Sequence, residues 1–197
     1  MATAINKGKV APQSEFSDAS QVIVPITKNA HKGPAIKTAN KTVKILVYLD
    51  GTGIAETALR YIEDYTSMLA PEVKIKIHLL QVITHMTHYR LGDGVVTMVP
   101  YTEDEIKQTT DKATDYLNQA GEPLRSKGLT VATRVGIKTE PSKKIVKTAE
   151  EISADLIVMF THKRSWLSRL AFGSVTDKVL RREDDVPVMV VRVDDYS

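Results

Sequence analysis

The sequence contains no cysteine among its 197 residues, which excludes disulfide bonds, thiolate metal ligands and a thiol nucleophile. It has a single tryptophan, and no apolar run approaches the roughly 20 residues that a membrane-spanning helix needs. The N-terminus lacks the charged and then apolar order of a secretory signal. These absences are typical of a cytoplasmic protein, and we expect no membrane span.

A strong excess of charge is also absent from most of the chain. Residues 1–42 hold six lysines against two acidic residues, whereas the whole chain has a net charge of +3 at pH 7. The basic charge therefore belongs to this first segment and not to the folded body. Because nucleic-acid-binding domains concentrate basic side chains on their folded surface, we expect no nucleic-acid partner.

Two segments differ in their pattern. Residues 1–42 show no helical or strand periodicity apart from the short apolar patch VIVPI, so we expect a flexible, lysine-rich arm. Its charge leaves a second interpretation open, in which the arm docks onto a partner or an anionic surface. Residues 43–197 are regular and are expected to form one domain.

Apolar runs alternate with amphipathic stretches from Thr42 onward. Five runs predict buried strands: TVKILVYLD, KIKIHLLQVI, LTVATRVG, DLIVMF and VPVMVVRV. Helical spacing predicts a helix after each of the first four, with a capping box at Thr102 and Glu105 and a helix start near Pro141. The pattern is that of an α/β fold with an open, mostly parallel sheet and helices on both faces. Ligands of such sheets bind beyond the carboxyl ends of the strands.

Residues 84–101 separate the second strand from the second helix. We expect this segment to be a long loop that covers a ligand or meets a partner, or else a variable surface loop. His85 and His88 lie in it, but no third ligand is in view, so we expect no metal site. Trp166 lies between two arginines, and we expect it either to anchor a partner or to pack over the sheet edge.

Four segments carry a family resemblance: Asp50-Gly51-Thr52 after the first strand, HLLQVI, VGIKTEPSKKIVKTAEEISADLIVM and GSVTDKVLRREDDVPVMVV. Through them the chain resembles, from about Val43 to Val193, the universal stress protein family. The resemblance implies a Rossmann-like sheet of five parallel strands in the order 3-2-1-4-5, similar to adenine-nucleotide hydrolases. It also implies a homodimer that is joined through the fifth strands, which would cover the exposed edge of that strand.

One branch of this family binds ATP through the pattern G-x2-G-x9-G-[S/T] after the fourth strand. Gly173 and Ser174 match its last two positions, whereas Phe160 and Lys163 stand where the first two glycines are expected. Tyr48 replaces a proline that binders often carry. The resemblance implies nucleotide-binding residues at Asp50, Gly51, Thr52, Val82, Met159, Phe160, Lys163, Gly173, Ser174 and Val175.

The half-replaced pattern leaves two hypotheses open. In the first, the amides that begin the fourth helix still bind phosphate, with His162, Lys163 and Arg164 supplying charge in place of backbone donors. In the second, Phe160 and Tyr48 fill the site, and the protein is a nucleotide-free interaction module. Ser174 and Asp177 also match an ordinary helix cap, and Asp50 an ordinary turn cap.

Patterns typical of enzymes are absent from the sequence, including a G-x-S-x-G elbow, a Walker A loop and H-E-x-x-H. We therefore expect a regulator without a catalytic residue, in which any ATP hydrolysis is slow and incidental. The expected ligand is ATP or another adenine nucleotide, with or without magnesium, and no ligand if the site is closed. A regulatory protein partner is expected, but the sequence does not identify it.

Overall fold

The computed structural model describes residues 24–26, 42–52, 55–69, 72–84, 86–92, 94–162, 173–182 and 186–193. Its elements are β1 (Val24–Ile26), β2 (Thr42–Tyr48), α1 (Ala55–Ser67), β3 (Lys74–Ile83), β4 (Thr87–Gly92), β5 (Val95–Pro100), α2 (Glu103–Ser126), β6 (Thr130–Ile137), α3 (Pro141–Ile152), β7 (Leu156–His162), α4 (Ser174–Leu180) and β8 (Val188–Val193). None of the helices in these described ranges is long and apolar enough to cross a membrane.

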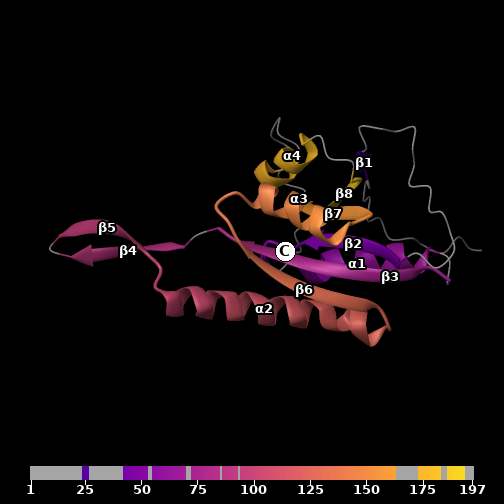
Figure 1. The fold of residues 1–197 in the computed structure, drawn as a ribbon, viewed down its shortest axis with the longest axis horizontal. Helices are drawn as coiled ribbons and strands as arrows, with labels where there is room; N and C mark the ends of the chain where they lie inside the picture. Colours follow the sequence, from indigo (N-terminus) through magenta and orange to yellow (C-terminus); the bar gives the residue numbers. More distant parts are fainter. Residues whose placement is uncertain are drawn as a thin grey trace, which may run out of the picture.

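The main sheet has the strand order β1-β8-β7-β2-β3-β6 (Figure 1). All pairs from β8 to β6 are parallel, and only β1 runs antiparallel to its neighbour. The five parallel strands, numbered by their order along the chain, therefore lie in the order 3-2-1-4-5. This confirms the expected open, Rossmann-like sheet.

Successive side chains of each strand point alternately to the two faces of this sheet. Ile45 and Val47 of β2 pack in one core cluster with α1 and α2, whereas Leu46 between them packs in the other cluster with α3 and α4. Both clusters contain fully buried aliphatic side chains, which explains why the strands are continuous apolar runs in the sequence. The helices therefore cover both faces, as predicted.

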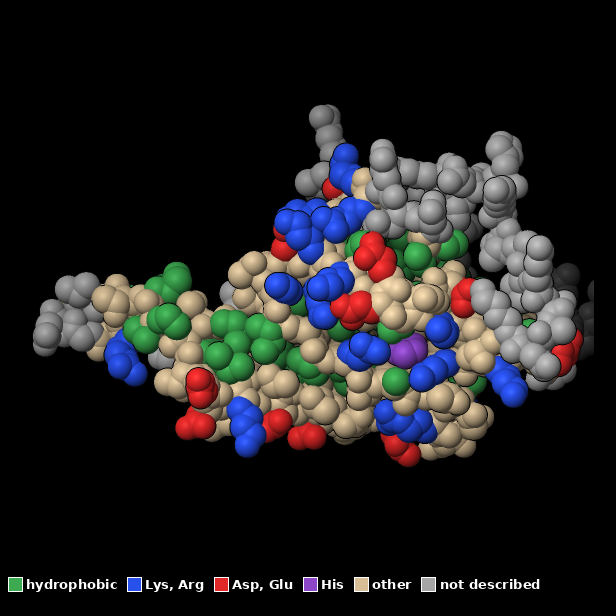
Figure 2. All heavy atoms as spheres, in the orientation of Figure 1, with side chains coloured by type: hydrophobic (Ala, Val, Ile, Leu, Met, Phe, Trp, Pro, Cys, Tyr) green, Lys and Arg blue, Asp and Glu red, His purple; other side chains and the backbone are tan. Residues whose placement is uncertain are grey.

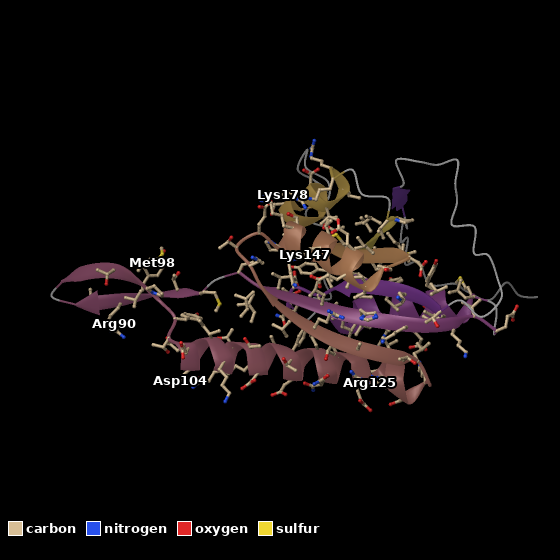
Figure 3. The ribbon with its side chains drawn as sticks, viewed as in Figure 1. Arg90, Met98, Asp104, Arg125, Lys147 and Lys178 are labelled. Carbon is tan, nitrogen blue, oxygen red and sulfur yellow. The ribbon has the colours of Figure 1, made fainter. Side chains whose placement is uncertain are left out.

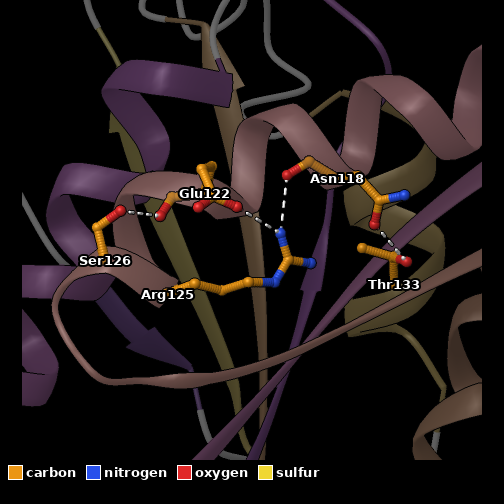
Figure 4. A network of polar contacts seen from close by, with 5 residues as sticks. All are labelled: Asn118, Glu122, Arg125, Ser126 and Thr133. Carbon is orange, nitrogen blue, oxygen red and sulfur yellow. Dashed lines mark hydrogen bonds and ion pairs between the residues drawn. The ribbon is translucent and has the colours of Figure 1, made fainter.

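Helix α2 begins with the predicted capping box: the Thr102 hydroxyl accepts from the Glu105 amide, and the Glu105 carboxylate accepts from the Thr102 amide. Pro123 lies inside the same helix and lacks an amide hydrogen for the preceding turn. Arg125 donates to the carbonyl oxygen of Asn118 at 2.8 Å, and the Asn118 side chain accepts from Thr133 of β6 at 3.1 Å (Figure 4). The first contact lies within α2, and the second ties α2 to the sheet.

The expectation of a loop over residues 84–101 was wrong. The segment forms an antiparallel hairpin of β4 and β5, a two-stranded sheet of its own that projects beyond the start of α2 (Figure 1). A hydrogen bond of 2.8 Å from the Tyr101 amide to the Met86 carbonyl closes its base. The hairpin turn contains Gly94 with φ of 78°, a backbone angle that favours glycine.

The edge of β8 is also covered in a way that the sequence did not predict. Val24 pairs with Val190 and Ile26 with Val188, so β1 lies along the edge at which the fifth strand of a second copy was expected. Part of the VIVPI patch in the arm is therefore a strand. The remainder of residues 1–41 lies outside the described residues, and its expected flexibility stays a prediction.

Candidate functional site

Strands β2 and β7 part at their carboxyl ends. Their pairing ends at Val47 and Val158, whereas β7 remains paired with β8 as far as His162. On its other side β2 continues alongside β3, and the Leu49 amide donates to the Leu80 carbonyl at 2.9 Å. Since β2 is the first of the five parallel strands along the chain and lies between β3 and β7, this is the point at which the strand order reverses. The predicted site residues after β2 and within β7 lie here.

Asp50, Gly51 and Thr52 form a tight turn directly after β2. One carboxylate oxygen of Asp50 accepts two hydrogen bonds from Thr52, from its amide at 3.0 Å and from its hydroxyl at 2.6 Å. Asp50 thus caps the turn, as one of the two interpretations of this residue expected. The residue is nevertheless exposed, so its carboxylate also faces solvent at the switch point. Tyr116 of α2 donates to the Thr52 carbonyl at 3.3 Å and holds the turn from the other side.

Gln81 is a site residue that the sequence analysis missed. Gly51 has φ of 85°, and a Cβ atom built there would lie 2.4 Å from the Gln81 amide nitrogen. The Gln81 side chain therefore lies directly against the turn, and its amide oxygen is buried without a hydrogen-bond partner among the described residues. The run KIKIHLLQVI also contains Lys74, Lys76 and His78, so the sequence alone does not single out Gln81.

Tyr48 ends β2 beside this turn and is half-buried against the core cluster of α3 and α4. Burial, and secondly the negative charge of Asp50, raise the pKa of its phenol to about 12. The phenol is therefore neutral at physiological pH. It brings a bulky ring and a hydroxyl to a position where the resemblance expected proline.

Three predicted lining residues belong to the strands themselves. Val82 of β3 and Met159 of β7 are buried in the core cluster on the α3 and α4 side. Phe160 is half-buried, continues β7 opposite Val191, and packs against the cluster on the α1 and α2 side. The position expected for the first glycine of the cradle is therefore an extended strand position in this chain.

Gly173 occupies the N-cap of α4 with φ of 76° and ψ of 155°, and no side chain among the described residues caps this helix start. No described atom lies within 4 Å of a Cβ atom built at Gly173. The expected cap by Ser174 and Asp177 is not formed: Ser174 is exposed, and Asp177 accepts from Arg181 at 2.7 Å. Val175 packs against the core cluster of α3 and α4.

Other candidates fall partly or wholly outside the described residues. These are Lys163, Arg164, Trp166, Arg169 and His85. The backbone of His88 lies in β4, and that of His162 ends β7. Within the described part of the chain, no three histidine or acidic side chains are grouped as metal ligands.

Comparison with protein families places this geometry in a known context. The family model described as "Universal stress protein family" matches residues 42–192. Universal stress protein MJ0577 of Methanocaldococcus jannaschii is 30% identical over 155 residues, which cover 76% of this chain and 94% of that protein. The family match extends from the start of β2 into β8 and includes every element that surrounds the switch point.

Solved structures resemble the fold over a similar length. The MJ0577 structure is 25% identical, has a TM-score of 0.55 and covers 78% of this chain and 97% of its own. A universal stress protein from Archaeoglobus fulgidus has a TM-score of 0.53 at 22% identity over 76% of this chain and 98% of that chain. A family protein from Arabidopsis thaliana, solved with AMP bound, has a TM-score of 0.50 at 12% identity over 76% and 91%. This chain belongs to the universal stress protein family.

Proposed function

We propose that this protein is a stress-response regulator that binds ATP or a related adenine nucleotide where β2 and β7 part. The observation that carries the proposal is the Asp50-Gly51-Thr52 turn, which lies at the reversal of strand order with its carboxylate exposed. The AMP bound to the Arabidopsis relative supports the choice of an adenine nucleotide. In this proposal the nucleotide is a regulatory ligand, and any hydrolysis of ATP is slow and incidental.

The residues present suit a nucleotide that is held in an atypical way. The uncapped start of α4 at Gly173 and Ser174 offers backbone amides without a competing side chain, and positive φ at Gly173 lets a ligand approach. Asp50 would hold the nucleoside or a magnesium ion beside the phosphates. Lys163 would supply a positive charge where other members use glycine. Val82 and Met159 would line the base.

A second candidate function rests on Tyr48. Its half-buried phenol beside Asp50 occupies volume at the end of β2, which favours a closed site. In that case the protein is a nucleotide-free interaction module. Phe160 supports this candidate less, because its ring packs on the core cluster of α1 and α2.

Calorimetric titration of ATP, ADP and AMP into nucleotide-stripped protein, with and without magnesium, tests the proposal. We expect dissociation constants of roughly micromolar order that tighten with phosphate number. Asp50→Asn should weaken binding, whereas Gly128→Ala, before β6 and at the opposite end of the sheet, should not. The interaction module would be favoured by two results together. The folded wild-type protein would bind none of the three nucleotides, and binding would appear in Tyr48→Pro or in the double variant Phe160→Gly, Lys163→Gly.

The partner and location belong to the same proposal. A homodimer through the fifth strand would require β1 to leave the edge of β8, because both occupy the same backbone groups. We propose that the arm, through β1, competes with a second copy for the edge of β8 and so limits dimerisation through the fifth strand. A regulatory protein partner and a cytoplasmic location complete the proposal, the latter because the cysteine-free sequence suits a reducing compartment.

A further inference from the structure

The hairpin of β4 and β5 carries an unusual concentration of exposed apolar side chains. Among the described residues, six large hydrophobic side chains are exposed, and four of them belong to this hairpin: Tyr89 (73% exposed), Leu91 (72%), Val96 (63%) and Met98 (61%). A fifth, Ile137, ends β6. Figure 2 shows hydrophobic atoms on the projecting hairpin and on the adjoining body.

The strand register places these four side chains on one face. Tyr89 lies opposite Met98, and Leu91 lies opposite Val96, two residues further along the same strands. Arg90 and Thr97 lie between these pairs and therefore point to the other side. Figure 3 shows Met98 and Arg90 pointing to opposite sides of the hairpin. We call Tyr89, Leu91, Val96 and Met98 the apolar hairpin face.

The described part of the body does not cover this face. The hairpin is a separate two-stranded sheet, and each of the four side chains keeps well over half of its surface exposed. Two-stranded hairpins are at best marginally stable in water unless an apolar face packs against something. Contiguous apolar patches of several hundred Å² typically mark interaction sites. The face therefore needs a partner.

We propose that the apolar hairpin face docks against the same face of a second copy of this chain. A twofold axis across the strands, between the two residue pairs, brings Tyr89 and Met98 of one copy over Leu91 and Val96 of the other. The larger pair then meets the smaller pair in both halves of the contact, which is the self-complementarity that a twofold interface requires. The charged Arg90 stays on the outer side, away from the contact.

The exposed area of the apolar hairpin face is large enough for contact with a second copy of the chain. At these exposures, the four side chains present roughly 500 Å² per chain, so two copies can bury at most about 1,000 Å² in total through them. That total lies at the lower limit for a specific interface and predicts a reversible dimer. The edge of β8 is already paired with β1, and four of the six exposed large hydrophobic side chains among the described residues lie on the hairpin, which makes the hairpin the surface for a second copy.

Sedimentation velocity of the full chain over a range of concentrations tests the proposal. Wild type should dimerise with a dissociation constant of roughly 1–100 µM. Leu91→Asp should raise this constant by at least about tenfold, because a charge would be buried in the contact. The matched control Thr97→Asp places the same charge on the opposite face of the same hairpin and should change it less than about twofold.

Cross-linking identifies the face directly, because the wild-type chain has no cysteine. With a short bismaleimide, Leu91→Cys should form covalent dimers and Thr97→Cys should not. Equal cross-linking of the two variants would overturn the proposal, as would a wild type that stays monomeric throughout. A monomer in which Leu91→Asp weakens nucleotide binding would instead make the hairpin a lid over its own site. A monomer that captures a foreign protein through Leu91 would make it a docking site for that protein.

Discussion

Gly51 and Gly128 offer a direct test of the turn at the switch point. The two glycines have nearly the same backbone angle, with φ of 85° and 84°. A Cβ atom at Gly51 would lie 2.4 Å from the Gln81 amide nitrogen, whereas at Gly128 nothing lies within 4 Å. Replacement by alanine therefore places a side chain at positive φ in both positions, but only Gly51→Ala also collides with a neighbour.

The expected losses of stability follow from these two contributions. An alanine at positive φ costs about 1–2 kcal/mol, so we expect Gly128→Ala to lower the free energy of unfolding by that amount. Gly51→Ala should cost roughly 0.5–1.5 kcal/mol more, because the Gln81 amide must leave its preferred rotamer. The effect of alanine on the unfolded chain is the same in both variants and cancels in the comparison.

Urea denaturation of five proteins measures this difference: wild type, Gly51→Ala, Gly128→Ala, Gln81→Ala and the double variant at residues 51 and 81. Truncating Gln81 should remove the extra cost of Gly51→Ala but not the strain that it shares with Gly128→Ala. Equal losses for the two glycine variants, together with additive effects of Gly51→Ala and Gln81→Ala, would refute the contact between Gln81 and the turn. It would also remove Gln81 from the candidate site.

Three further predictions test other parts of the fold. Burial, and secondly neighbouring cations, lower the pKa of His78 to about 4. The folded protein therefore keeps this histidine neutral below pH 6.5, where the unfolded chain takes up a proton, and the free energy of unfolding should fall by roughly 3 kcal/mol from pH 6.5 to 4. His78→Leu should flatten this pH profile in urea titrations. Gly121→Leu should cost at least about 1–3 kcal/mol in thermal unfolding because its Cβ position lies 3.0 Å from Val131, whereas the exposed control Glu122→Leu should cost little. Removal of residues 1–26 should uncover β8 and increase self-association in sedimentation; an unchanged monomer fraction would show that β1 does not limit pairing at this edge.

Much of the sheet could be predicted from the sequence because its strands are buried on both faces. A run such as TVKILVYLD has few alternatives to a central strand, and Thr102 with Glu105 marks a helix start by chemistry that is local to four residues. The hairpin was predictable in principle: apolar side chains alternate on either side of Gly92-Asp93-Gly94, which is a turn signal. The length of the segment led to the expectation of a loop instead.

The position of β1 could not be predicted in this way. It has three residues, one of them Pro25, which is tolerated in a strand only at special positions such as the edge of a sheet, and the local sequence does not show that this segment lies at an edge. Its strand conformation depends on pairing with the edge of β8, more than 160 residues away along the chain. Such a contact is decided by tertiary structure, and nothing within the VIVPI patch specifies its partner.

The site residues also divide into those that local sequence predicts and those that depend on tertiary contacts. Asp50 as a turn cap was one of the two interpretations drawn from its local sequence, and the structure contains that turn. Gln81 was missed because its importance comes from the distance to Gly51, which only the pairing of β2 with β3 produces. The capping role considered for Asp177 was wrong because Arg181, one helical turn later, takes its carboxylate.

In the proposed nucleotide site, Phe160 affects which backbone groups would contact phosphate. Because β7 stays paired with β8 through His162, the chain cannot bend at residue 160 as it could with a glycine there. Phosphate contacts would then come mainly from Gly173 and the start of α4. Gly173→Ala, which opposes the φ of 76°, should therefore weaken ATP binding by about tenfold or more with a smaller effect on AMP. Phe160→Gly should mainly lower stability, since it removes a half-buried ring from the core cluster and leaves a glycine in a strand. Calorimetry could instead show that Phe160→Gly lowers the dissociation constant for ATP and that Gly173→Ala leaves it unchanged. Phosphate recognition would then depend on the segment after β7 and not on α4.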